Sequence, residues 1–209
     1  MFFSMSFMTP AKDSLIDRAV SILNRGGVVA FPTDTVYGIG AHPCRPEAVH
    51  KLYQVKGRPI DKPIPILLGS IGDVEQVAQN VPQSFFQLAN RYWPGELTLI
   101  VEAKNLPPEV TAGGKTVGLR MPNHALALKL LHSFGRPIAT TSANKSDEMP
   151  ATSSEEVRNN LGKLVDLILD GGQTFTKTAS TVLDLSVCPP QIRRHGGIPA
   201  DGLMPYLDA

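Results

Sequence analysis

Cysteine is scarce in this sequence. The 209 residues include two cysteines, Cys44 and Cys188, which are too few for a disulfide framework or a four-cysteine zinc site. Because this scarcity is typical of proteins in a reducing compartment, we expect a cytoplasmic protein. A run of about 18 apolar residues is also lacking, which excludes a membrane-spanning helix and argues against a membrane partner.

An excess of charge of one sign is lacking too. Twenty basic side chains against nineteen acidic ones leave a formal net charge of +1. A protein that binds nucleic acid over its whole surface has a strongly basic balance, so that class is excluded, whereas a local basic patch remains open. Hydrophobic residues make up 42% and charged residues 19% of the chain, and these proportions are typical of a globular domain rather than a disordered or fibrous chain.

Helical patterns and short apolar runs alternate along the chain. Helices are expected over 14–25, 46–55, 72–79, 83–92, 125–134 and 155–161, with Asp13 or Ser14 as the first cap. Strands are expected over 28–31, 64–68, 97–101, 117–121, 138–141, 165–169, 181–185 and 191–194. This order predicts a three-layer α/β fold with helices flanking a twisted sheet. The sheet should be mixed parallel and antiparallel, because several connections are too short for a helical crossover.

A composition break that would mark a linker is absent. We therefore expect one domain over 13–209, preceded by a flexible N-terminus over 1–12. The first eight residues are apolar but lack the basic lead-in of a signal peptide. The polar stretch 142–154 is predicted to be a long loop over a functional site.

Two glycine motifs point to nucleotide binding but are incomplete. The run Gly113–Thr116 resembles the end of a P-loop, yet Glu109 stands where its first glycine is needed, so we interpret it as a turn before a strand. The run Gly38–Gly40 has Pro43 in place of the third glycine of a dinucleotide fingerprint. The five histidines are scattered without the spacing of metal ligands, so no metal site is predicted.

A short basic strip is the first sign of a binding site. Four cations lie within twelve residues and give a local charge of +3, namely Lys51, Lys56, Arg58 and Lys62, opposed by Asp61. The planar fork of arginine and the compact charge of lysine both suit phosphate oxygens. From charge alone, a solvated helix end whose cations complement the helix dipole is an equally good interpretation.

Polar side chains also follow or interrupt the predicted strands. They are Thr33, Asp34 and Thr35, Arg120, the run Thr140–Asn144, Ser180 and Thr181, and Arg193 and Arg194. Ligands of α/β sheets bind in the crevice beyond the strand ends. Hydroxyl, amide and guanidinium groups that meet there would form a site for a small polar molecule and a phosphate.

Eight short motifs, in this order, resemble the YrdC-like threonylcarbamoyl-AMP synthases. They are PTDTVYG (32–38), KGRP (56–59), KP (62–63), PGELT (94–98), GLRMP (118–122), SAN (142–144), STV (180–182) and RRHG (193–196). The resemblance runs from about residue 14 to 197 and corresponds to the single-domain form of the family. It implies a YrdC-like fold with a large, positively lined concave surface.

The resemblance also implies a reaction. L-Threonine, bicarbonate and ATP would give L-threonylcarbamoyladenylate and pyrophosphate, which makes the protein a nucleotidyltransferase. The product would serve the threonylcarbamoyladenosine modification of tRNA, so that tRNA and a downstream threonylcarbamoyl transferase machinery would be further partners. Mg²⁺ would be carried with ATP, and no prosthetic group is implied.

Site residues follow from the same resemblance. The catalytic tetrad would be Lys56, Arg58, Ser142 and Asn144. ATP would be held by Arg58, Lys62, Thr116, Ser142 and Arg194. Threonine would be held by Thr35, Arg120, Thr140 and Ser180, with Arg120 facing its carboxylate. Leu67 stands where some members have a histidine that contacts threonine, so either threonine is held without that contact or amino-acid selectivity is looser.

Two other functions stay open at this stage. A non-catalytic module could bind tRNA or double-stranded RNA in the same basic concavity, through phosphates and shape, although a net charge of +1 argues against strong affinity. A different carbamoyl transfer is the other alternative, since hydrogenase-maturation carbamoyltransferases contain a related domain. Those proteins also carry acylphosphatase and zinc-finger segments, which this sequence does not contain.

Overall fold

Helices and strands form largely where the apolar patterns place them. The computed structural model describes residues 12–174 and 178–206, so the predicted N-terminal segment lies outside the described residues except for Lys12. The helices are α1 (Lys12–Asn24), α2 (Pro46–Lys56), α3 (Val74–Val77), α4 (Gln83–Tyr92), α5 (Pro108–Thr111), α6 (Ala125–Phe134) and α7 (Ser154–Leu161), with short 3₁₀ turns at Ile71–Asp73, Gly162–Leu164, Ala200–Gly202 and Met204–Tyr206. The strands are β1 (Val29–Pro32), β2 (Tyr37–Ala41), β3 (Ile66–Leu67), β4 (Leu97–Glu102), β5 (Thr116–Arg120), β6 (Ile138–Ser142), β7 (Leu167–Ile168), β8 (Thr181–Asp184) and β9 (Gln191–Arg194).

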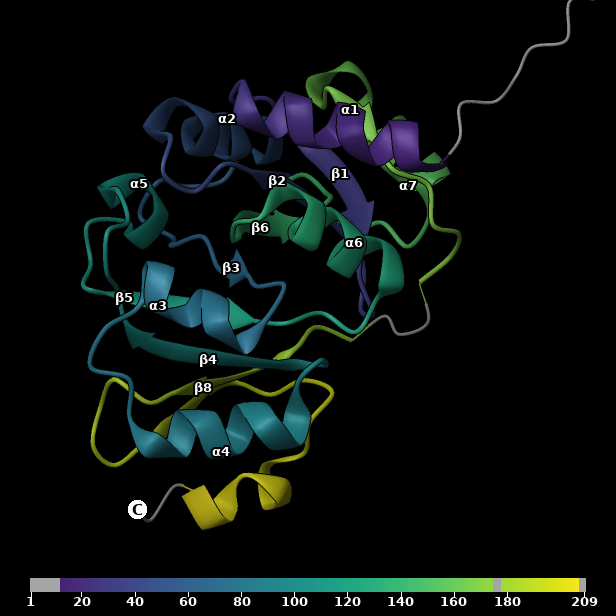
Figure 1. The fold of residues 1–209 in the computed structure, drawn as a ribbon. Helices are drawn as coiled ribbons and strands as arrows, with labels where there is room; N and C mark the ends of the chain where they lie inside the picture. Colours follow the sequence, from purple (N-terminus) through teal and green to yellow (C-terminus); the bar gives the residue numbers. More distant parts are fainter. Residues whose placement is uncertain (1–11, 175–177, 207–209) are drawn as a thin grey trace, which may run out of the picture.

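The strands join into one mixed sheet in the order β7-β1-β2-β6-β3-β5-β4-β8-β9. The pairs β1–β7, β3–β5 and β4–β8 are parallel, and the other neighbouring pairs are antiparallel. Figure 1 shows α1 and α2 at the top of the view, over β1 and β2, and α4 at the bottom, beneath β4 and β8. The predicted mixed sheet flanked by helices is therefore confirmed.

Two apolar clusters cover the two faces of the sheet. Along β1, Val29 and Phe31 belong to the cluster beneath α1 and α6, whereas Ala30 belongs to the larger cluster that includes residues of α2 and α4. This alternation follows from the two-residue period of a strand. It explains why β1 is apolar throughout, since both of its faces are buried.

Strand β2 is a strand that the sequence patterns did not predict. Its glycines lower strand propensity, but neighbouring side chains fill the space above them. A Cβ at Gly40 would lie 2.6 Å from Ile138 Cγ2 and 2.8 Å from Phe31 Cε1. A Cβ at Gly38 would lie 2.8 Å from Thr140 Cγ2. The glycines of this run thus belong to a central strand and not to a dinucleotide-binding loop.

Smaller differences concern lengths and short turns. The predicted helix over 72–79 is a 3₁₀ turn (Ile71–Asp73) followed by the four-residue helix α3. Strands β3 and β7 each contain two residues, so they are shorter than the predicted 64–68 and 165–169. Helix α5, a single turn, was also not predicted.

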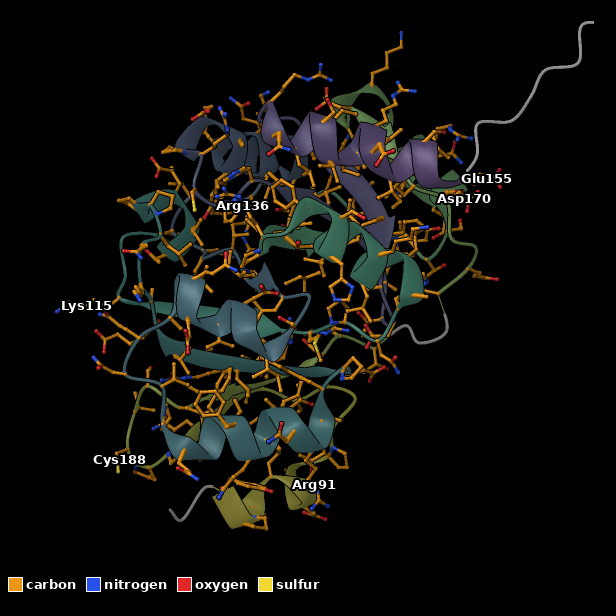
Figure 2. The ribbon with its side chains drawn as sticks, viewed as in Figure 1. Arg91, Lys115, Arg136, Glu155, Asp170 and Cys188 are labelled. Atoms are coloured by element: carbon orange, nitrogen blue, oxygen red, sulfur yellow. The ribbon has the colours of Figure 1, made fainter. Side chains whose placement is uncertain are left out.

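Cys44 and Cys188 are exposed and unpaired, and Figure 2 shows Cys188 at the periphery. Over residues 12–174 and 178–206, no helix has the length and apolarity needed to cross a membrane.

The packing over β2 predicts a stability effect. Gly40→Ala should lower the free energy of unfolding by about 1–3 kcal/mol, because the added methyl group overlaps Ile138 and Phe31. Urea denaturation measures this change. Gly72→Ala is the control, since its nearest neighbour would be Ser70 Oγ at 3.6 Å, and it should shift stability by less than about 1 kcal/mol. Equal stability of both variants would contradict the close packing over β2.

Candidate functional site

A cavity of about 440 Å³ opens where the polar strand ends meet. Its walls come from the turn after β1, the segment 58–67, the strands β2, β4, β5 and β6, and the β8–β9 hairpin. Eight of the eleven predicted site residues line it, namely Thr35, Arg58, Thr116, Arg120, Thr140, Ser142, Ser180 and Arg194. Leu67 lines it as well. Lys56, Lys62 and Asn144 are the predicted residues that do not.

Strand register brings distant residues to this cavity. In the β2–β6 pair Gly38 lies opposite Ser142, and in the β3–β5 pair Leu67 lies opposite Arg120. Since successive side chains of a strand point to opposite faces, register decides which of them face the cavity. The short segments 33–38, 118–120 and 140–142 therefore meet, although long stretches of chain separate them.

Lys56 holds the loop that follows β6. Its side chain is buried, with 5% of the residue exposed. Nζ donates to the carbonyl oxygen and Oγ of Ser142, both at 3.0 Å, and to the carbonyl oxygen and Oδ1 of Asn144 at 3.2 and 2.8 Å. Asn144 Nδ2 in turn donates to the carbonyl oxygens of Lys145 and Glu148. Lys56 and Asn144 thus lie behind the cavity wall and fix its shape.

Burial also changes the acidity of this lysine. Loss of hydration, and secondly the nearby charge of Arg58, lower the pKa of Lys56 to about 8. At pH 7 the ammonium form still dominates and offers three N–H donors to its four oxygen neighbours. At neutral pH the charged side chain of Lys56 therefore keeps its hydrogen bonds to Ser142 and Asn144.

Arg58 reaches the cavity because α2 ends directly before it. Gly57 caps α2 in the left-handed conformation, with φ of 62°. Arg58 then donates through Nε to the carbonyl oxygen of Lys62 at 3.2 Å and through Nη2 to that of Pro63 at 3.1 Å. The segment 58–63 thus curves around the guanidinium group. Burial lowers the pKa of Arg58, and Lys62 itself is exposed.

Arg120 is anchored on three sides within β5. The residue is 7% exposed. Nε donates to the carbonyl oxygen of Gly95 at 2.9 Å, Nη1 to Thr35 Oγ1 at 3.2 Å and Nη2 to Asp34 Oδ1 at 2.5 Å. Burial lowers the pKa of Arg120, and the negative charge of Asp34 opposes that shift. The guanidinium group consequently has one fixed orientation at the cavity wall.

Ser180, Thr98 and Arg194 form a third polar group in the cavity. The hydroxyl oxygens of Ser180 and Thr98 are 2.8 Å apart. Arg194 donates through Nη2 to Ser180 Oγ at 3.1 Å and through Nε to the carbonyl oxygen of Ser180 at 3.0 Å. Thr98 was missing from the predicted site, although it closes the PGELT motif, which was the available signal. Thr33 and Thr141 line the cavity as well. Their positions at strand ends predicted this, although the family resemblance assigned them no role.

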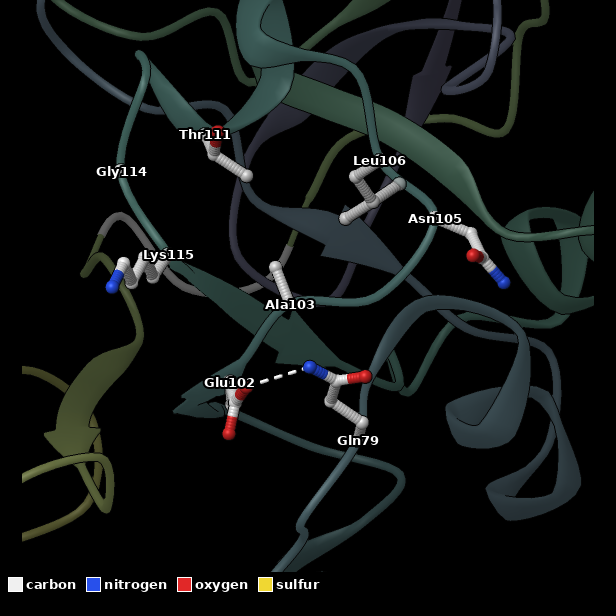
Figure 3. A pocket seen from close by; sticks show the side chains of 8 residues that line it. All are labelled: Gln79, Glu102, Ala103, Asn105, Leu106, Thr111, Gly114 and Lys115. Atoms are coloured by element: carbon white, nitrogen blue, oxygen red, sulfur yellow. Dashed lines mark hydrogen bonds between the residues drawn. The ribbon is translucent and has the colours of Figure 1, made fainter.

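A second pocket, of about 380 Å³, lies on a different part of the surface. Figure 3 shows its lining, which contains Lys115 and a Glu102 carboxylate that accepts from Gln79 at 2.6 Å. Lys115 faces this pocket whereas Thr116 faces the larger cavity. The run Gly113–Thr116 therefore cannot surround one phosphate, which agrees with the predicted turn before a strand.

The cavity offers little to a tightly bound metal ion. In the part of the chain that the structure describes, no group of three or more His, Cys, Asp or Glu residues is arranged to hold a metal. The cavity lining supplies hydroxyl, guanidinium and apolar groups instead. Since Mg²⁺ prefers carboxylate oxygens and water, these residues do not fit a protein-held Mg²⁺ site.

The fold and the site together define the class of the protein. It is an α/β protein with a mixed sheet and a cavity lined by three arginines, Arg58, Arg120 and Arg194. The family model Sua5_yciO_yrdC, described as "Telomere recombination", matches residues 21–196. The chain belongs to the Sua5/YciO/YrdC family.

Individual relatives support this assignment. A threonylcarbamoyl-AMP synthase of Bacillus subtilis is 43% identical over 188 residues, which are 89% of this chain and 54% of that protein. The crystal structure of Pyrococcus abyssi Sua5 complexed with L-threonine matches with a TM-score of 0.89 and 39% identity, over 92% of this chain and 57% of that one. Escherichia coli YciO matches with a TM-score of 0.82 and 28% identity, over 95% of both chains. The chain spans about half the length of the curated relatives from P. abyssi and B. subtilis.

The burial of Lys56 predicts a titration near pH 8. In NMR spectra of protein with ¹³C-labelled lysine, its side-chain signal should shift at about pH 8 instead of near 10.5. The folded-state pKa lies below that of the unfolded chain, so the energetic penalty of the buried charge is complete below pH 8. It disappears between about pH 8 and 10.5, and the free energy of unfolding should rise over that range. Lys56→Met should abolish both effects, and a signal that shifts above pH 10 would contradict the burial argument.

Proposed function

We propose that this chain is an L-threonylcarbamoyladenylate synthase, which converts L-threonine, bicarbonate and MgATP to L-threonylcarbamoyladenylate and pyrophosphate. The single observation that carries the proposal is the meeting of Arg58, Arg120 and Arg194, with several hydroxyl groups, in one cavity. The reaction requires three anions to be brought together, and fixed cations offset their repulsion. Relatives named threonylcarbamoyl-AMP synthase support the same reaction.

Threonine would occupy the part of the cavity beside Arg120. The fixed guanidinium group can donate to a carboxylate, which is the geometry that arginine suits best. Thr35, which accepts from Arg120, and Thr140 and Ser180 also line the cavity, and their hydroxyl groups could bond the amine and the side-chain hydroxyl of the amino acid. Leu67 adds an apolar surface, so in this chain threonine would be held without a histidine contact at that position.

The nucleotide would occupy the part beside Arg58 and Arg194. Thr116 and Ser142 also line the cavity and would add hydroxyl groups to the nucleotide site. Lys62, which is exposed close to Arg58, could add a charge at the mouth of the cavity. Mg²⁺ would enter as part of the MgATP substrate, because the triphosphate itself supplies its oxygen ligands.

The chemistry divides into carbamate formation and adenylyl transfer. The neutral amine of threonine forms a C–N bond with the carbon of bicarbonate, and water leaves, which gives an N-carboxylate. An oxygen of this carbamate then attacks the α-phosphorus of ATP, and the bond to the β-phosphate oxygen breaks as pyrophosphate leaves with the electron pair. Arg58 and Arg194 would stabilise the charge on the phosphates, so positioning and electrostatics would supply most of the catalysis.

The predicted catalytic tetrad would divide into two pairs of different role. Arg58 and Ser142 line the cavity and would contact substrate. Lys56 and Asn144 would act as positioning residues, because they bind the loop after β6 and each other. The Lys56 ammonium bonds both oxygens of Ser142, so its loss would shift a residue that does line the cavity.

In a cell the product would feed the threonylcarbamoyladenosine modification of tRNA. Its mixed anhydride is activated for acyl transfer, so a downstream threonylcarbamoyl transferase machinery and tRNA would be the consumers. The two exposed, unpaired cysteines suit the reducing cytoplasm.

Pyrophosphate release tests the proposal. The purified chain with MgATP should release pyrophosphate only when both L-threonine and bicarbonate are present, and the product should contain one threonylcarbamoyl group per AMP by mass spectrometry. Release that is independent of threonine would contradict the proposed reaction. Binding of tRNA that weakens steeply with salt, without any turnover, would instead favour the RNA-binding module.

Arg58 should carry a large part of the rate. Arg58→Ala should lower kcat by about 10²-fold or more, the usual effect of removing one donor to a transition state. Steady-state pyrophosphate release measures it, and circular dichroism should show an unchanged fold. Arg91→Ala is the matched control, because Arg91 is exposed on α4 at the lower end of Figure 2. An Arg58→Ala rate close to that of the control would remove Arg58 from this role.

A further inference from the structure

Asp34 is a largely buried carboxylate that bonds a residue of the cavity lining, Arg120. Its Oδ1 accepts from Arg120 Nη2, and the two side chains are 11% and 9% exposed. Asp34 is not among the residues that line the cavity. The turn that carries it is fixed by Thr33, whose Oγ1 accepts from the backbone N–H groups of Thr35 and Val36. Asp34 is therefore held behind Arg120 by its own backbone.

The charges in the cavity act on one another. Burial lowers the pKa of Arg194, and the positive charge of Arg120 lowers it further. The two guanidinium groups thus repel each other across the cavity. The negative charges of Asp34 and, secondly, of Glu96 act on Arg120 in the opposite direction and favour its charged form. The carboxylate of Asp34 therefore offsets the charge of one particular arginine.

The other two arginines of the cavity have different neighbours. The hydrogen bonds found for Arg58 run to the carbonyl oxygens of Lys62 and Pro63, and those of Arg194 run to the carbonyl and hydroxyl oxygens of Ser180. These acceptors are uncharged, although the charge of Asp61 also acts on Arg58. Arg120 instead shares a direct hydrogen bond and ion pair with a carboxylate, which offsets its charge while its remaining N–H groups stay available as donors.

We propose that Asp34 is a positioning and specificity residue that orients Arg120 and cancels its charge, so that this side of the cavity accepts an amino acid zwitterion and rejects polyphosphate. The inference rests on the proposed function, which puts threonine beside Arg120. A zwitterion has no net charge, whereas a triphosphate carries several negative charges. Cancelling one positive charge therefore weakens polyphosphate binding far more than threonine binding. Without Asp34 the triphosphate would compete for the threonine position.

A purely structural ion pair is the competing explanation, since removal of one partner of a buried pair is destabilising in itself. Asp34→Asn separates the two roles. The asparagine oxygen can still accept from Arg120 and keep it in place, while the negative charge is lost. A change in ligand selectivity in this variant reports on charge, whereas a change in melting temperature alone reports on structure.

The experiment is isothermal titration calorimetry with L-threonine and with inorganic tripolyphosphate, separately and together, at one ionic strength. Wild type should bind both ligands, each with little effect on the other. In Asp34→Asn the affinity for threonine alone should stay within about threefold, while tripolyphosphate should bind about tenfold more tightly. Saturating tripolyphosphate should then weaken threonine binding by about tenfold or more in this variant only.

Two further variants complete the design. Asp34→Ala removes the acceptor as well as the charge, so threonine affinity should fall by about tenfold or more. Asp34→Asn keeps the acceptor and should retain threonine affinity. Asp184→Asn is the matched control, because Asp184 is also a buried carboxylate paired with an arginine, Arg193, but lies outside the cavity lining. It should leave the competition between the two ligands as in wild type. If Asp34→Ala does not fold, the comparison of the two asparagine variants decides.

The outcomes distinguish the inference from the function on which it rests. Wild type that binds threonine, together with an Asp34→Asn variant that gains neither tripolyphosphate affinity nor competition, would overturn the role of Asp34 and leave the proposed function intact. Wild type that does not bind threonine would overturn the proposed function and this inference with it. Equal changes in Asp34→Asn and Asp184→Asn would show that loss of any buried pair has the same effect, and would also overturn the inference.

Discussion

The constraint on which the rest of the structure depends is that three arginines share one cavity, where the charge of Arg120 acts against that of Arg194. Each guanidinium group is held by acceptors that the fold supplies, and most of these are backbone carbonyl oxygens, such as those of Gly95, Pro63 and Ser180. A carbonyl oxygen is fixed in place by the backbone that carries it. The sheet order and strand register therefore determine where positive charge lies, and the cavity is ready for anionic ligands before they arrive.

Around this cavity, the side chains that hold the wall in place differ from the side chains that line it. Lys56 binds the loop after β6 with four hydrogen bonds and does not line the cavity, while Ser142, which it holds, does. In the same way Asp34 holds Arg120 through an ion pair, and Arg120 lines the cavity whereas Asp34 does not. Groups that lie behind the wall can be buried and fully bonded, which makes them rigid, whereas the groups at the wall keep donors for a ligand. The proposed function would therefore depend on the residues behind the cavity wall as much as on those that line the cavity.

Much of this could be predicted from the sequence, and the exceptions have physical causes. Helix α6 lies where its apolar spacing and Gly135 predict it, and eight of eleven predicted site residues meet at the cavity. Strand β2 was missed because its glycines are explained mainly by side chains of β6, Ile138 and Thr140, which are distant in sequence. Thr98 was missed because only the pairing of β4 with β8 brings it near Ser180. Local patterns report on local structure, and these two features depend on long-range register.

The shortness of β3 has a mechanical consequence. This two-residue strand is the junction between the β7-β1-β2-β6 part of the sheet and the β5-β4-β8-β9 part, and the cavity spans that junction, with Thr140 on one part and Ser180 beside the other. Two register pairs join β3 to each of its neighbours, so the two parts of the sheet are connected there over a short length. A ligand that bonds both parts would act as a cross-link between them and would stiffen the sheet along this line.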